Sequence, residues 1–305
     1  MNVLLTGASG YVGLHLLRGL LDAGHRVTAL VRTPGRLGPL AAAPGLTVLQ
    51  ADLEDEARVS SAVVGQSVCV HAALIWGAPR SELEFRDTAV AAKLFDAAGR
   101  AGVSRCILLS STAVHRPFRQ LMNEDDSVTT TDVYGATKAA AELVMHAACA
   151  TYSMSGVVLR PGAVVGPPAF PGGAFRHERH LVQIAEAARA GLPIQVRRRE
   201  GRQLCPVSLL AQAVVALVQE PRPAPRYLCM SPERTLWEDV ARRVVVRLGS
   251  PSTVQVTDRQ NPVPPPYFRV DRLRTLLRVL RAADAELDAH VDLLFASASP
   301  PLPPG

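Results

Sequence analysis

The amino-acid sequence predicts an α/β fold in which a doubly wound parallel sheet is followed by a smaller C-terminal region. Three observations predict it. Strand patterns alternate with helical patterns over the first 110 residues, the expected strands are apolar on both faces, and a glycine-rich turn joins the first strand to the first helix. Strands of this kind are typical of a parallel sheet that is covered by helices on both sides.

Each element is expected from its own pattern of apolar residues. Short β-branched and Leu-rich runs predict strands at 3–5, 27–31, 47–50, 67–71, 107–110 and 157–159. Apolar spacing of three and four residues predicts helices at 11–23, 84–100, 136–152, 181–190, 209–219 and around 237–248. Gly24 stands directly after the first helix, as a helix C-terminal glycine does.

A change of texture after Arg160 marks the boundary of the sheet region. Eight Pro and Gly residues fall between positions 161 and 173. We therefore expect a dinucleotide-binding domain at 1–165 and a mostly substrate-binding region at 166–305, with about 204–230 returning to the sheet. The Pro-rich end at 297–305 is expected to be a flexible tail.

The composition excludes several classes of protein. Of the 305 residues 48% are apolar and 20% are charged, which excludes a disordered chain. The net charge of +6 is mild and only 5% of residues are aromatic, so no nucleic-acid partner is expected. The start of the chain has no signal-peptide pattern, and the charge-free run at 59–79 contains Gly, Gln, Ser and His. We expect no membrane span and a cytoplasmic protein.

The cysteines and the basic residues carry further information. The five cysteines form no C-x-x-C pair, so they predict buried free thiols in a reducing compartment and no metal site. Of the 33 basic residues, 31 are Arg and only Lys93 and Lys138 are Lys. Such a skew is typical of a GC-rich genome, so a position that keeps Lys merits attention.

A glycine-rich turn at residues 6–13 predicts a dinucleotide site. Gly7, Gly10 and Gly13 follow the first strand at the spacing that lets a pyrophosphate approach the backbone and the helix N-terminus. An acidic residue near the end of the second strand is typical of NAD sites, but Arg32 and Arg36 stand here. A guanidinium can bind a 2′-phosphate, so NADP(H) is favoured over NAD(H).

Tyr134 and Lys138 stand four residues apart at a helix start, hence on one face. A phenol with its ordinary pKa of about 10 is a poor acid or base at neutral pH. A nearby ammonium lowers the pKa of a phenol, so this pair predicts proton-transfer chemistry.

These motifs together resemble the extended branch of the short-chain dehydrogenase/reductases, which holds NAD(P)-dependent epimerases, dehydratases and ketoreductases on a Rossmann fold. The resemblance runs to about residue 285. It rests on Thr-Gly-x-x-Gly-x-x-Gly at 6–13, Asp-Leu at 52–53, His-Ala-Ala at 71–73, the serine segment at 110–114, Tyr-x-x-x-Lys at 134–138, and Arg-Pro-Gly at 160–162 with Gly-Pro at 166–167.

The resemblance implies roles for individual residues. Ser111, with Thr112 as the fallback, would orient the reacting oxygen, Tyr134 would transfer the proton, and Lys138 would hold the nicotinamide ribose. The implied cofactor-binding set is Gly7, Ser9, Gly10, Tyr11, Val12, Gly13, Arg32, Arg36, Asp52, Leu53, Ala72, Ala73, Tyr134, Lys138 and Pro161. Thr112 and Arg202 would bind substrate. Three departures affect the substrate pocket: His115-Arg116 for Tyr-Gly, Asp87 for Asn, and Leu209 for Asp.

The motifs favour an NADPH-dependent ketoreductase among the family's reactions. Thr112 is followed by Ala113 and Val114, where the dehydratases have an Asp-Glu pair, and Arg32 disfavours an epimerase that retains NAD. The epimerase remains an alternative, and a non-catalytic NADP(H) sensor is a second one. The substrate would be a nucleotide-linked deoxysugar ketone or a secondary-metabolite ketone.

The arginines of the second region have two interpretations. Those at 176, 179, 197, 198, 199 and 202 would bind a diphosphate or form an ordinary solvated surface. The resemblance also implies a homodimer that forms through the helices at 84–100 and 136–152.

Overall fold

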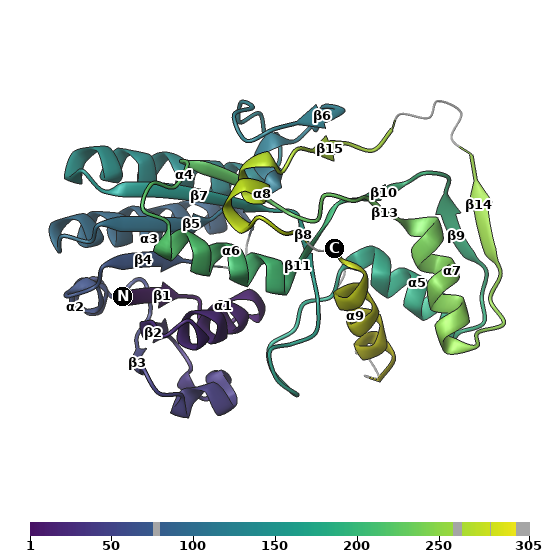
Figure 1. The fold of residues 1–305 in the computed structure, drawn as a ribbon, viewed down its shortest axis with the longest axis horizontal. Helices are drawn as coiled ribbons and strands as arrows, with labels where there is room; N and C mark the ends of the chain where they lie inside the picture. The colour runs from purple at the N-terminus through teal and green to yellow at the C-terminus, as the bar shows by residue number, and fades with distance from the viewer. Residues whose placement is uncertain (76–79, 259–263, 281, 297–305) are drawn as a thin grey trace.

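A seven-stranded parallel sheet forms the centre of the computed structural model, which describes residues 1–75, 80–258, 264–280 and 282–296 (Figure 1). The strand order is β12-β7-β5-β4-β1-β2-β3. The strands are β1 (Asn2–Thr6), β2 (Arg26–Val31), β3 (Leu46–Gln50), β4 (Val68–His71), β5 (Arg105–Leu109), β7 (Ser155–Pro161) and β12 (Arg226–Cys229). The predicted doubly wound parallel sheet is therefore confirmed.

Helices cover both faces of this sheet. One face carries α1 (Tyr11–Asp22), α6 (Val207–Gln219) and α8 (Asp271–Leu277), and the other carries α2 (Glu56–Val63), α3 (Arg80–Arg100) and α4 (Val133–Tyr152). Two 3₁₀ segments, η1 (Pro34–Ala42) and η2 (Thr112–His115), follow β2 and β5.

The two-sided apolar character of the strands follows from this layering. In β1 the side chains of Val3 and Leu5 enter the core beneath α1 and α6, whereas Leu4 enters the core beneath α3 and α4. Successive side chains of a strand point to opposite faces, so a strand buried on both faces needs apolar residues at every position.

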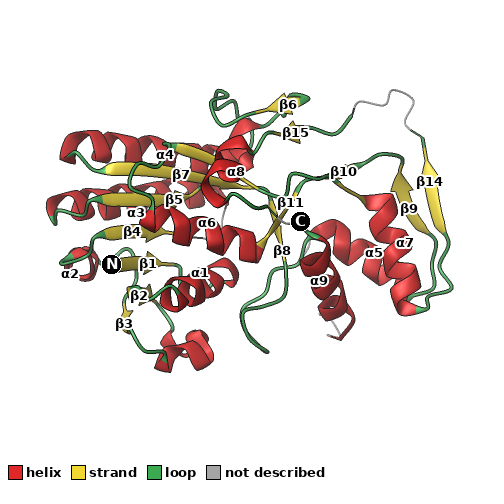
Figure 2. Ribbon diagram, in the orientation of Figure 1, coloured by secondary structure: helices red, strands yellow, loops and turns green. Residues whose placement is uncertain are grey.

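The smaller region has its own hydrophobic core to one side of the sheet (Figure 2). Its helices are α5 (Arg179–Arg189), α7 (Trp237–Leu248) and α9 (Asp284–Ala296). Two pairs of parallel strands accompany these helices. The first is β8 (Ala163–Val165) with β11 (Leu204–Pro206), and the second is β9 (Ile194–Arg197) with β14 (Val254–Thr257). The antiparallel pair β10 (Gly201–Arg202) with β13 (Thr235–Leu236) lies between them, and β6 (Leu121–Met122) pairs with β15 (Tyr267–Phe268) above the sheet.

The observed bounds of several helices and strands differ from the bounds that the sequence predicts. The six expected strands are all present, and α7 has the expected bounds. Helix α4 begins at Val133 and not at residue 136, because the Asp132 side chain caps it. The segment expected to return to the sheet, at about 204–230, contains α6 and the edge strand β12, which pairs with β7. The elements η1, α8 and α9 had no specific prediction. The tail predicted at 297–305 lies outside the described residues.

Two predictions about composition are also checked. All five cysteines are buried and free, as predicted. Within the described part of the chain, no helix is both long and apolar enough to cross a membrane.

Candidate active site

The glycine turn after β1 is too tightly packed for side chains at two of its glycines. Gly7 has a φ of 72°, and a Cβ there would lie 2.6 Å from the main-chain nitrogen of Ala73. A Cβ on Gly13 would lie 1.9 Å from the carbonyl oxygen of Gly7. The turn therefore lies directly against the segment that follows β4, and its bare backbone leads into the N-terminus of α1. This is the cradle that a dinucleotide pyrophosphate needs.

The other predicted cofactor residues follow the carboxyl ends of neighbouring strands. Arg32 and Arg36 are exposed after β2, and Asp52 follows β3, where its Oδ1 accepts a hydrogen bond from the Glu54 amide (3.0 Å). Leu53 is buried beside Asp52. The segments with Ser9, Gly10 and Val12, with Ala72 and Ala73, and with Pro161 follow or end β1, β4 and β7. In a parallel sheet these ends share one edge, which is where nucleotides bind.

Unlike the other predicted cofactor residues of the glycine turn, Tyr11 has a side chain that is bound to another part of the protein. The phenol donates a hydrogen bond of 2.9 Å to the carbonyl oxygen of Gly166, and burial raises its pKa. The side chain therefore links α1 to the exit of β8, and only the main chain of this residue remains for a cofactor.

Ser111 and Tyr134 meet at the same edge of the sheet. Ser111 caps η2, and its Oγ accepts a hydrogen bond from the Ala113 amide at 3.1 Å. A side-chain hydrogen bond also joins Ser111 to Tyr134, in the first turn of α4. Thr112, the fallback for Ser111, is buried.

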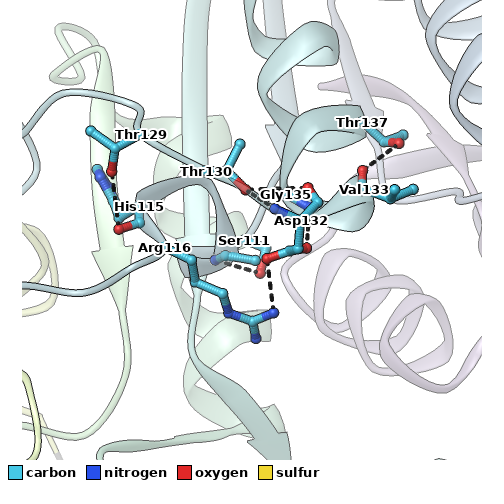
Figure 3. Close-up of polar contacts among 10 residues, drawn as sticks. Ser111, His115, Arg116, Thr129, Thr130, Asp132, Val133, Gly135 and Thr137 are labelled. Atoms are coloured by element: carbon cyan, nitrogen blue, oxygen red, sulfur yellow. Dashed lines mark hydrogen bonds and ion pairs between the residues drawn. The ribbon is translucent and has the colours of Figure 1, made fainter. Parts of the chain in front are cut away.

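A network of polar contacts brings η2 and the start of α4 together (Figure 3). Asp132 accepts hydrogen bonds from the Gly135 amide (2.8 Å) and from Arg116 (3.1 Å). The hydroxyl of Thr129 donates to the carbonyl oxygen of His115, and the Thr129 and Thr130 amides both donate to the carbonyl oxygen of Val114. This network places Tyr134 beside Ser111.

Burial determines the proton affinities at this site. Burial raises the pKa of Tyr134, while the Ser111 hydrogen bond and the charges of Arg176 and Arg116 lower it. The net direction is opposite to the one expected from the Lys138 ammonium, because removing the phenolate from water costs more than these contacts return. Burial also lowers the pKa of Lys138, against the attraction of Asp87 and Glu142.

A buried ion pair lies behind Ser111. Arg160 is 1% exposed and binds Glu142 through two hydrogen bonds, Nε to Oε1 (3.0 Å) and Nη2 to Oε2 (2.6 Å). The hydroxyl of Ser110 donates to Glu142 Oε1 at 2.5 Å. The ion pair therefore ties β5, β7 and α4 together beneath the site. A signal for Glu142 was present, since it lies one turn beyond Lys138 on the same helix face.

His115 completes this network, and its partners identify its protonation state. Arg160 Nη1 lies 2.9 Å from His115 Nε2, and His115 Nδ1 lies 3.1 Å from the carbonyl oxygen of Ser127. A guanidinium can only donate, so Nε2 accepts and Nδ1 carries the proton. Burial and the Arg160 charge accordingly lower the pKa of His115. The sequence marked His115 only as a departure from the family pattern.

Arg202 contacts the second region. Its guanidinium lies 3.5 Å from Glu178 Oε1, 3.4 Å from His180 Nδ1 and 5.4 Å from the centre of a Trp237 ring. Within the part of the chain that the structure describes, the Arg202 side chain contacts only this region and does not reach Ser111, Tyr134 or Lys138.

A hollow of about 1040 Å³ lies between the loop after η2 and the β10–β13 pair. Its lining includes four arginines: Arg119, Arg198, Arg199 and Arg234. Within the described residues, this lining does not include Ser111, Tyr134 or Lys138. Glu200 and Asp258 also line the hollow, and Asp258 is paired with Arg198, so the four arginines and two acids leave a net positive charge.

Comparison with known proteins gives concordant similarities. The model of the NAD-dependent epimerase/dehydratase family matches residues 3–228. The 3-beta-hydroxysteroid dehydrogenase of Mycolicibacterium neoaurum is 32% identical over 179 residues, 54% of this chain and 48% of that enzyme, so the chain spans about half the length of that relative. The dTDP-4-dehydro-6-deoxy-D-allose reductase of Streptomyces bikiniensis is 27% identical over 312 residues, 93% of this chain and 91% of that enzyme.

Similarity also extends to solved structures. UDP-glucuronic acid 4-epimerase from Bacillus cereus, in complex with NAD, superposes with a TM-score of 0.81 at 18% identity and covers 97% of this chain and 99% of its own. At this identity the likeness concerns the fold alone.

Proposed function

Because the chain belongs to the NAD-dependent epimerase/dehydratase family, we propose that it is an NADPH-dependent ketoreductase, which reduces a carbonyl group to an alcohol. The observation that carries the proposal is the meeting of Ser111 and Tyr134 at the sheet edge that holds the glycine cradle, with Lys138 one turn further along α4. A bound nicotinamide nucleotide would supply the hydride.

The chain's own residues would handle the proton and the orientation of the carbonyl group. The Ser111 hydroxyl would donate a hydrogen bond to the carbonyl oxygen, and Tyr134 would transfer its proton to that oxygen. Lys138 would bind the ribose and stabilise the phenolate that remains. Since burial raises the pKa of Tyr134, the phenol keeps its proton at neutral pH, as an acid catalyst must.

A reductase fits this site better than a dehydratase. Ala113 and Val114 follow Thr112, and both are apolar and buried. They cannot supply the acid and base that the expulsion of water needs. The full-length similarity to a dTDP-linked ketosugar reductase supports a nucleotide-linked deoxysugar ketone as substrate, and a secondary-metabolite ketone is the other candidate. The arginine-lined hollow would suit a diphosphate.

NADPH as the reductant is supported by the residues after β2. Arg32 and Arg36 are exposed there, and the acidic residue typical of NAD sites is replaced by Arg32. Glu54, the acidic side chain whose pKa the Arg32 charge helps to lower, is already bound by Arg86 through hydrogen bonds of 2.9 and 2.6 Å. Glu54 is therefore compensated by Arg86, and the charge of Arg32 would remain for a 2′-phosphate. The similar structure of the B. cereus epimerase contains NAD instead, so the proposal of NADPH rests on the residues of this chain.

The test of the reaction is oxidation of NADPH with a panel of dTDP-linked ketosugars and alicyclic ketones. Tyr134→Phe should lower kcat by about 10²- to 10⁴-fold and leave NADPH binding intact. Tyr152→Phe is the matched control, since Tyr152 lies on the same helix but binds Asp96. Tight NADPH binding without oxidation by any ketone would favour the sensor. Stoichiometric NAD carried through purification would favour the epimerase.

The test of the cofactor is a charge reversal at each end of β2. Arg32→Glu should weaken NADP(H) binding by about 10- to 100-fold, the value of one or two charge-assisted hydrogen bonds. The control Arg26→Glu changes an exposed arginine at the other end of the same strand and should have no effect. An unchanged NADP(H) affinity in Arg32→Glu would refute the assignment of the 2′-phosphate.

A homodimer that forms through α3 and α4 is a further part of the proposal. These two helices pack against each other on one face of the sheet, and Leu143 on α4 is 70% exposed. The mass of the protein in solution, measured by light scattering, distinguishes a monomer from a dimer.

A further inference from the structure

A strap from the second region, residues 166–175, crosses the helix that begins the dinucleotide site. The strap follows β8 and passes α1 (Figure 1). The Tyr11 hydroxyl donates to the carbonyl oxygen of Gly166 at 2.9 Å. The His15 Nε2 lies 3.0 Å from the carbonyl oxygen of Pro167, and because a carbonyl oxygen only accepts, this nitrogen carries the proton. The first two turns of α1 therefore bind the main chain of the strap.

A tight turn carries Phe170 at the tip of the strap. The Gly173 amide donates a hydrogen bond of 2.9 Å to the carbonyl oxygen of Phe170. Pro171 and Gly172 stand between these two residues, and Gly172 has a φ of 76°. Proline at the second position and a glycine with positive φ at the third are typical of a type II β-turn. The run Phe-Pro-Gly-Gly therefore fixes the main chain from which the Phe170 ring projects.

The Phe170 ring lies against η1, the segment that follows β2. A Cβ on Gly38 of η1 would lie 2.5 Å from Cζ and 2.6 Å from Cε2 of this ring. Gly38 has a φ of 53° and a ψ of −134°, a conformation that interrupts η1 and that residues with a Cβ rarely adopt. The ring therefore occupies the place where a side chain at position 38 would begin.

The strap and η1 also share the hydrophobic core beneath α1. Leu37 of η1 is fully buried in this core, and Ala169 of the strap is 4% exposed. Leu40 and Phe170 are half-buried and pack against the same core. Apolar contacts therefore hold η1 in place, and the second region supplies part of them.

Arg36 lies on η1 between the end of β2 and the contact with Phe170. Its side chain is exposed, and its amide donates to the carbonyl oxygen of Thr33 at 3.1 Å. Arg32 stands directly before Thr33, and Gly38 comes two residues after Arg36. The short segment from Arg32 to Gly38 is thus fixed by the sheet at one end and by the Phe170 ring at the other. The direction of the Arg36 guanidinium depends on both.

We propose that Phe170 is a positioning residue that holds η1 against the core, so that Arg36 joins Arg32 at the 2′-phosphate of NADP(H). This role rests on the proposed cofactor, and it assigns part of the cofactor preference to a residue of the second region. NADPH and NADH differ only in the 2′-phosphate. Loss of the ring should therefore weaken the binding of NADPH and spare that of NADH, whereas a ring needed only for stability would affect both alike.

The central test compares the dissociation constants of NADPH and NADH, measured from the fluorescence of the bound dihydronicotinamide. Phe170→Ala should weaken NADPH binding by about 10-fold, the value of one charge-assisted hydrogen bond, and leave NADH binding unchanged. Phe170→Met restores a long apolar side chain and should recover most of the loss. An unchanged ratio of the two constants in Phe170→Ala would overturn the proposal.

The matched control is Phe175→Ala, which removes a second ring from the same strap. The Phe175 ring packs edge-on against Tyr11, with 5.6 Å between ring centres, and lies 4.7 Å from the His290 ring. A disturbance passed on through Tyr11 would reach the pyrophosphate, which both nucleotides carry, so the ratio of the two constants should stay unchanged. An equal loss of NADPH preference in Phe175→Ala would contradict a role specific to Phe170.

Gly38→Ala keeps the proposal testable if Phe170→Ala does not fold. The added methyl group enters the space of the Phe170 ring and pushes η1 away from it. The preference for NADPH over NADH should therefore fall in this variant as well. A retained preference in Gly38→Ala would show that the contact between the ring and η1 does not position the arginines.

Binding and turnover separate this inference from the proposed function. Loss of NADPH preference in Phe170→Ala, in a protein that reduces no ketone, would refute the ketoreductase and support the role of Phe170. A preference that Arg32→Glu abolishes and Phe170→Ala retains would refute the role of Phe170 alone. An unsubstituted protein that binds NADH as tightly as NADPH would refute the NADPH assignment and this role together.

Discussion

Arg160 carries a full positive charge into the protein interior, where Glu142 is its counterion. Two hydrogen bonds, a neighbouring Ser110 hydroxyl and the neutral His115 ring satisfy most of the polar atoms of this pair. A buried pair of this kind contributes modestly as a whole, but the loss of one partner leaves an uncompensated charge in a medium of low dielectric constant. The loss of either Arg160 or Glu142 would therefore disturb the packing of α4 and of the segment that carries Ser111.

The prediction at this scale contrasts a buried ion pair with an exposed one. Glu142→Gln should lower the free energy of unfolding by about 3 kcal/mol, because the Arg160 charge loses its counterion. Glu54→Gln is the control: Glu54 has a similar pair of hydrogen bonds with Arg86, but both side chains are more than 40% exposed. Unfolding in urea gives both values, and equal losses would contradict the argument from burial.

The first turn of α4 is the element on which the site depends. Asp132 caps it, Tyr134 lies within it, and Arg116 after η2 binds the outer oxygen of the cap. The first amides of a helix have no partner within the helix, so a side-chain acceptor decides whether that turn forms. The cap therefore holds the proton donor against Ser111.

Removal of the Asp132 cap should lower the activity more strongly than the small loss in the free energy of unfolding suggests. Asp132→Ala should destabilise the protein by about 1 kcal/mol and lower kcat, since the turn that carries Tyr134 loses its anchor. Asp132→Asn keeps the acceptor for Gly135 and should retain most of the activity, although it loses the ion pair with Arg116. Chemical unfolding and steady-state kinetics measure the two effects. Comparable kcat losses in both variants would show that the ion pair, and not the cap, positions Tyr134.

Two buried histidines contribute to the acid sensitivity of the whole molecule. Burial lowers the pKa of His71 to about 3 and that of His290 to about 4, against about 6.5 in an unfolded chain. Below pH 6.5 the unfolded state therefore binds more protons than the folded state. Stability from these groups is present above pH 6.5 and is lost as the pH falls toward the folded values.

The expected size of this effect follows from the linkage. His71 alone should make the protein about 2 kcal/mol less stable at pH 5 than at pH 8. His71→Gln should flatten the acid limb of a plot of unfolding free energy against pH, and adding His290→Gln should flatten it further. Urea unfolding between pH 5 and pH 8 gives the slopes. An acid limb of unchanged slope in the double variant would exclude these two histidines as its cause.

Local patterns account for most of the fold that could be predicted. The apolar strands and the glycine turn are visible in the sequence because each depends on neighbours within a few residues. A return to the sheet was expected at about 204–230, but no local pattern marked the edge strand β12 itself. Its four residues, Arg226–Cys229, form a strand by pairing with β7, which ends 65 positions earlier. Elements stabilised by distant partners have weak local patterns.

The candidate site also contains residues that the sequence predicted and residues whose contacts only the structure shows. Ser111, Tyr134 and Lys138 were predicted from a motif and a helical spacing, and the structure joins Ser111 to Tyr134 by a hydrogen bond. Arg202 shows the other case, because only the fold reveals that its contacts are Glu178, His180 and Trp237.

The sequence by itself determined the parallel sheet, the glycine cradle and the alignment of Tyr134 with Lys138 on one helix face, since strand alternation and helix periodicity are properties of neighbouring residues. Only the tertiary structure decided that Arg160 from β7 meets Glu142 from α4 and His115 from η2. Periodicity shows which face of an element is buried, but the partner across that face depends on how the elements pack. The buried polar network beneath Ser111 and Tyr134 therefore comes from segments that only folding brings together.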